Sequence, residues 1–280
     1  MRRKLLLPFG LLACWLVALP VAAKDAPVAK PSPAAPAKPA TPAPDSGGGA
    51  AGETIDNARQ YQHCIALARQ KPAEGWEEAL AWTSLGGGEA ARHCAAIALI
   101  GLRQYEEAAS RLEELANSSH REAILRAGML AQAGQAWLLA KNPERAYAAQ
   151  TAGLKLVPGA PDLLIDRAES LAEAKNYKDA LADLDQALAA APTRVDALTY
   201  RATARRYLDD QKGAADDLAK ALALDPLYQD AWLESGILQR LAGHPAEARQ
   251  AWLKVLEIAP SSAAADAARR NIELLDVDPR

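Results

Sequence analysis

The sequence predicts an all-α protein, built as an α-solenoid of helix–turn–helix units. The 280 residues include 66 alanines and 39 leucines, which favour helices, but only 23 isoleucines, valines and threonines together, which favour sheets. Small residues and prolines also recur every 34 residues over the second half of the chain. Composition disfavours a sandwich, a barrel or a doubly wound sheet, and the period predicts one repeated unit.

Residues 1–23 have the pattern of a secretory signal peptide. A basic start is followed by an apolar run from Leu5 to Val21 and by small residues before a cleavage site after Ala23. Two alternatives remain at this point. The apolar run could stay as an uncleaved membrane anchor, or the sequence ending in Cys14 could act as a lipoprotein signal.

Residues 24–52 predict a disordered linker rich in proline and alanine. Seven prolines and seven alanines fall between residues 25 and 45, and three glycines follow. Such a segment has too few apolar anchors to build a core and favours extended polyproline II. We therefore expect a tether between the exported leader and the folded part.

Four repeats are predicted between residues 123 and 260, at about 127–160, 161–194, 195–228 and 229–260. Four columns recur in one register: three hold small residues, with Val255 as the larger exception, and the fourth holds proline. The columns are Gly134, Ala168, Ala202 and Gly236; Ala146, Ala180, Ala214 and Ala248; Gly153, Ala187, Ala221 and Val255; and Pro158, Pro192, Pro226 and Pro260. Small residues let two helices approach closely, and a proline ends the second helix of each unit.

This pattern resembles the tetratricopeptide repeat (TPR), a helix–turn–helix unit of 34 residues. Residues 161–192 read as a standard copy, and the copy from residue 229 has Trp232 and Gly236 at the family's frequent positions. Departures occur at Gln150, Pro143, Gln211 and Pro245. The resemblance implies a superhelical array that binds other proteins.

The flanks of the four repeats are also expected to be helical. Residues 53–122 predict degenerate TPR-like helix pairs, with a copy at 89–120 and extra residues at 117–122 that break the register. Residues 261–280 predict a capping helix and tail, because Ala264, Ala268, Ile272 and Leu275 form one apolar stripe. Terminal repeats need such an atypical outer face.

Cys64 and Cys94 are the two cysteines that remain after removal of the signal peptide. An even number in an exported chain favours a disulfide between them. Free thiols and a zinc site with His63 and His93 are the alternatives. Adjacent residues on a helix point in different directions, which disfavours the metal, so we expect neither a metal nor a cofactor.

Known catalytic patterns are not found in this sequence. His120 and His244 lie beside turns, away from any serine or carboxylate pattern suited to activating a nucleophile. The glycines at 86–88 lack the lysine of a phosphate-binding loop. The balance of 32 basic and 35 acidic residues gives no case for nucleic acid. We therefore expect a non-enzymatic protein.

The resemblance places the partner-binding groove on the first helix of each repeat. Arginine and tyrosine are frequent in binding hot spots, and we expect Arg206 and Arg240 to receive an acidic group of a peptide. Threonines and aliphatic residues stand where chaperone-binding TPRs carry lysine and asparagine, so chaperone tails are not expected. The predicted groove residues are Thr199, Thr203, Arg206, Tyr207, Leu233, Ile237, Arg240 and Leu241.

Together these features predict a protein–protein interaction scaffold in the bacterial cell envelope, located in the periplasm or in another exported compartment. The bacterial source is inferred from the alanine- and arginine-rich composition. The alternatives are a membrane-anchored or lipoprotein TPR assembly factor, and a metal-binding accessory protein that uses the His-Cys pairs. A membrane would be contacted only through an uncleaved N-terminal segment, and the expected partners are proteins or peptides.

Overall fold

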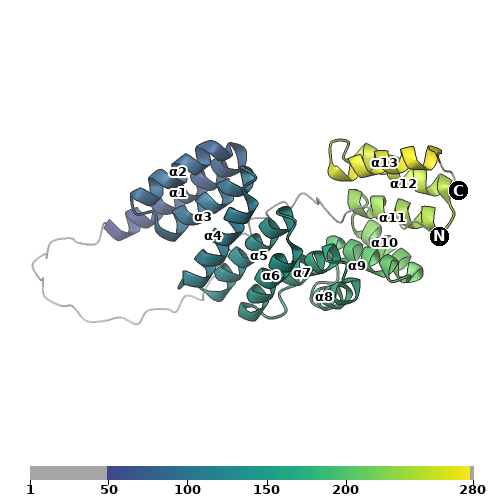
Figure 1. Ribbon diagram of the computed structural model, residues 1–280, viewed down its shortest axis with the longest axis horizontal. Helices are drawn as coiled ribbons and strands as arrows, with labels where there is room; N and C mark the ends of the chain where they lie inside the picture. Colours follow the sequence, from purple (N-terminus) through teal and green to yellow (C-terminus); the bar gives the residue numbers. More distant parts are fainter. Residues whose placement is uncertain (1–48, 278–280) are drawn as a thin grey trace, which may run out of the picture.

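The computed structural model describes residues 49–277, with side chains from residue 57 onward, and every regular element in that range is an α-helix (Figure 1). The helices are α1 (Gly49–Gln70), α2 (Pro72–Ser84), α3 (Gly88–Gly101), α4 (Tyr105–Ser118), α5 (Ala123–Leu139), α6 (Pro143–Leu156), α7 (Pro161–Glu173), α8 (Tyr177–Ala190), α9 (Val195–Tyr207), α10 (Gln211–Leu224), α11 (Gln229–Leu241), α12 (Pro245–Ile258) and α13 (Ala263–Val277). The predicted cleavage after Ala23 and most of the predicted linker lie outside the described residues. Residues 49–52, which we assigned to the linker, are the start of α1.

The helices follow one another as antiparallel pairs along an elongated array (Figure 1). Each helix packs mainly on its neighbours in the chain, and the first helices α5, α7, α9, α11 and α13 also contact each other in succession. Four pairs, α5–α6 to α11–α12, correspond to the four predicted repeats. The α-solenoid prediction is confirmed, and α13 is the expected C-terminal helix.

The turn inside each pair has one backbone conformation that recurs with the repeat. Lys141, Lys175, Asp209 and Gly243, each 34 residues apart, have positive φ angles between 61° and 83°. After each first helix the next two amides bond back to its last turn, as in Asn176 N–H to Leu171 O at 2.7 Å. This Schellman arrangement satisfies the free carbonyls and reverses the chain.

The glycines of the small-residue columns lie where larger side chains need room. A Cβ atom on Gly134 would be 2.7 Å from Cγ of Gln150, and one on Gly236 would overlap the indole of Trp252. In the next column, a Cβ on Gly153 would meet the Leu163 side chain of the following repeat at 3.0 Å. The columns therefore control both packing within a pair and packing between pairs.

Two repeats also join their helices through a buried ion pair. Arg167 on α7 donates two hydrogen bonds of 2.7 Å to Asp183 on α8. Arg201 on α9 donates bonds of 2.9 and 2.7 Å to Asp217 on α10, one repeat further. The two aspartate side chains are only 6% and 5% exposed, so each carboxylate needs compensation. Asp183 receives it from Arg167 alone, whereas Asp217 also pairs with Arg205 at 2.7 Å.

Candidate functional site

The predicted groove residues lie on α9 and α11, but the two threonines are not available to a partner. Thr199 and Thr203 are buried. Their hydroxyls donate to the carbonyls of Val195 and Thr199 on the same helix, at 2.8 and 3.1 Å. These threonines therefore contribute to helix packing, and the groove surface is formed by other residues.

The predicted groove residues of α11 divide into a packed part and an accessible part. Leu233 and Ile237 pack against the C-terminal core formed by α12 and α13. Leu241 is 53% exposed, and Arg240 is partly exposed. Among the described residues Arg240 has no ion-pair partner, so its charge is not matched within the array.

Arg206 has an intramolecular partner that the sequence analysis did not predict. Its guanidinium forms a short ion pair with Glu234 on α11, and the two side chains are 10% and 8% exposed. The same guanidinium lies over the ring of Tyr207, 4.3 Å from its centroid. Tyr207 in turn stacks on Tyr177 with centroids 4.1 Å apart. The charge of Arg206 is therefore compensated within the array.

Carboxylates gather on the first helices next to this stack. Gln135 on α5 donates through Nε2 to Asp166 Oδ1 at 2.8 Å and to Glu169 Oε2 at 3.4 Å. Burial, with repulsion from Glu169, raises the pKa of Asp166 to about 8. Burial, with repulsion from Glu173, raises the pKa of Glu169 to about 7. This carboxylate cluster takes up protons near neutral pH.

Asp230 extends the acidic character of this face to α11. Burial raises the pKa of Asp230 to about 6. One oxygen of Asp230 and one oxygen of Glu173 are buried without a hydrogen-bond partner. The groove therefore carries carboxyl groups whose negative charge depends on the pH, in addition to the positive charge of Arg240.

The raised pKa of Asp166 predicts a pH-dependent stability. A carboxyl group whose pKa is raised by folding stabilises the fold below its ordinary pKa near 4, and that contribution is lost as the pH rises through about 8. Asp166→Asn keeps an oxygen for Gln135 and removes the charge. We expect the variant to be more stable than wild type by several kcal/mol at pH 9, and nearly equal to it at pH 4.

Urea unfolding at pH 4, 7 and 9 measures this difference. The matched control is Asp216→Asn on α10, an exposed carboxylate, whose effect should be the same at each pH. Parallel pH curves for Asp166→Asn and wild type would contradict the prediction.

The residues that the sequence analysis missed share one repeat position. Asp166, Tyr200 and Glu234 are separated by 34 residues and lie on α7, α9 and α11. Tyr200 is partly buried within the core around α9. A polar column at the repeat period was visible in the sequence and would have identified these residues.

At the N-terminal end, the structure joins Cys64 on α1 to Cys94 on α3 by a disulfide, with Cα atoms 6.1 Å apart. The ring of His93 contacts the Tyr61 hydroxyl at 2.9 Å and Gln132 Oε1 at 2.6 Å. Because the sulfur atoms of Cys64 and Cys94 are joined in the disulfide, neither is a free thiol that could bind a metal. Among the described residues no group of three or more His, Cys, Asp or Glu side chains could hold a metal ion.

Solved structures share this fold. The APC/C hetero-tetramer Cut9–Hcn1 aligns with a TM-score of 0.60 at 15% identity, over 79% of this chain and 44% of that chain. TTC0263, a thermophilic TPR protein of Thermus thermophilus, gives 0.56 at 18% identity, over 67% and 99%. MamA from Desulfovibrio magneticus gives 0.50 at 24% identity, over 60% and 93%.

No family model and no curated protein matches the sequence. The structural likeness, together with the 34-residue columns, defines the class: the chain folds as a TPR α-solenoid. At identities below 25%, the likeness shows the fold alone.

Proposed function

We propose that the protein is a non-enzymatic scaffold that binds a partner protein or peptide along its first helices. The observation that carries the proposal is the continuous succession of α5, α7, α9, α11 and α13, which places the carboxylate cluster on α7 and the accessible Arg240 and Leu241 on α11 along one series of first helices. Arrays of this kind bind ligands along such extended surfaces. The solved TPR proteins that share the fold agree with this general role.

We place this scaffold in the bacterial envelope, in the periplasm. Residues 1–23 support export by their basic, apolar and small-residue segments. The bond between Cys64 and Cys94 supports an oxidising compartment. No helix in the described part of the chain is long and apolar enough to span a membrane. Mass spectrometry of the protein from its host should show a chain that starts at Lys24; a retained leader would reject cleavage.

A capture experiment tests the groove. Immobilised wild type is compared with Arg240→Glu plus Leu241→Asp in an envelope extract. We expect the double variant to lose the partners that wild type retains, because it reverses the unmatched charge and removes the exposed apolar side chain. Arg206 is left unchanged, since its loss would leave Glu234 buried without compensation.

The matched control carries a similar change of charge on another helix. Lys212→Glu plus Lys220→Glu alters two exposed residues of α10 and should keep the full set of partners. If the groove variant and the control retain the same proteins as wild type, the surface on α11 is not the partner site.

A further inference from the structure

The last repeat lacks the ion pair that fills the same place in the two repeats before it. Arg201 and Asp217 join α9 to α10, as Arg167 and Asp183 join α7 to α8. The residues 34 positions after Arg201 and Asp217 are Ser235 and Ala251. Two short side chains therefore stand where an arginine and an aspartate fill the space between the helices.

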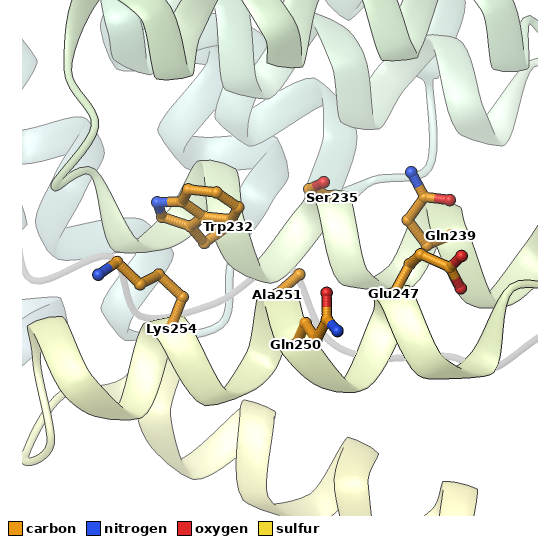
Figure 2. Close-up of a pocket in the computed structure, with 7 residues that line it drawn as sticks. All are labelled: Trp232, Ser235, Gln239, Glu247, Gln250, Ala251 and Lys254. Atoms are coloured by element: carbon orange, nitrogen blue, oxygen red, sulfur yellow. The ribbon is translucent and has the colours of Figure 1, made fainter.

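A cavity of about 340 Å³, largely open to solvent, lies at this position between α11 and α12. Figure 2 shows Ser235 facing Ala251 at its middle, Trp232 beside Lys254 at one end, and Gln239 beside Glu247 at the other. Such a volume is within the range of small ligand pockets and can hold one long side chain. We call this cavity the α11–α12 slot.

The walls of the slot are held in place and leave one charge unmatched. The indole of Trp232 donates to Pro226 O at 2.9 Å, and Gln239 Oε1 contacts His244 Nδ1 at 3.0 Å. Lys254 forms a solvent-exposed ion pair with Glu257 at 2.9 Å. Glu247 has no ion-pair partner among the described residues, so the Gln239 end of the slot is negative.

We propose that the α11–α12 slot binds an arginine side chain presented by a partner protein. The aliphatic stem lies against Trp232 and Ala251, and the guanidinium reaches the carboxylate of Glu247 and the amide oxygen of Gln250. Arginine fits because it offers five fixed donors and packs well on aromatic rings. The protein itself places arginine guanidinium groups between the two helices of the preceding repeats. This site is distinct from the groove of the proposed function.

Capped tripeptides test the slot directly. The full chain, labelled with ¹⁵N, is titrated with N-acetyl-Ala-Arg-Ala-amide and with the same peptide carrying norleucine, which has no charge. We expect the arginine peptide to shift the Trp232 indole signal and the α12 amides near Glu247, and the norleucine peptide to leave them in place. No shift with arginine, or equal shifts with both peptides, overturns the proposal.

Two variants locate the binding. Glu247→Gln removes the unmatched charge and should raise the dissociation constant about tenfold, whereas Glu273→Gln, an exposed carboxylate on α13, should leave it unchanged. Ser235→Arg plus Ala251→Asp restores the internal pair and should abolish binding while the helical circular dichroism is kept. If Glu247→Gln binds the arginine peptide as tightly as wild type does, the slot is not the binding site. This outcome holds even if the variant Ser235→Arg plus Ala251→Asp fails to fold.

Discussion

Arg167→Met should lower the free energy of unfolding by about 3 kcal/mol, because it leaves a buried carboxylate uncompensated. Asp183 is 6% exposed in its side chain, and both of its oxygens accept hydrogen bonds of 2.7 Å from Arg167. Methionine fills much of the space of the arginine stem but donates nothing. Urea unfolding followed by circular dichroism measures the loss.

The double variant Arg167→Met plus Asp183→Leu separates charge from packing. Replacing both partners of a buried pair by apolar residues is often neutral, so the double variant should recover most of the lost stability. Lys71→Met removes an exposed pair with Glu74, whose side chain is 56% exposed, and should change stability by less than about 0.5 kcal/mol. An equal loss in the single and the double variant would mean that shape, not the buried charge, decides the cost.

The fold could be predicted from the sequence because its determinants recur. A column such as Gly153, Ala187, Ala221 and Val255 reports a helix contact that is made again in every repeat, and four columns agree in one register. The start of α1 at Gly49 could not be predicted in the same way, because only one copy of that boundary exists. The left-handed residues of the turns, lysine and aspartate as well as glycine, follow the same period.

The candidate site was harder to predict because inward-facing residues differ in exposure from one repeat to the next. Thr199 and Leu233 share one family position, but the first is buried with its hydroxyl bonded to its own helix and the second packs on the C-terminal core. Arg206 was expected to meet a partner, yet it meets Glu234. Such pairs depend on which helix is next in the array, and a single repeat does not contain that information.

Removal of the Cys64–Cys94 disulfide should also cause a large loss in the free energy of unfolding. The bond closes a loop with a sequence separation of 30 residues, and the chain-entropy model assigns about 3–4 kcal/mol to a loop of this size. Cys64→Ala plus Cys94→Ala keeps two small apolar residues at these fully buried positions. We expect a lower urea midpoint for the double variant, and the same shift for wild type treated with a phosphine reductant.

The location of the loss is as informative as its size. In a repeat array each unit contacts only its neighbours, so the amides of α1–α4 should exchange with deuterium faster while those of α9–α13 stay protected. Thiol titration of the denatured, unreduced wild type checks the starting state and should find no free thiol. Two free thiols, or uniform loss of protection along the array, would contradict a disulfide that stabilises the least regular part of the chain.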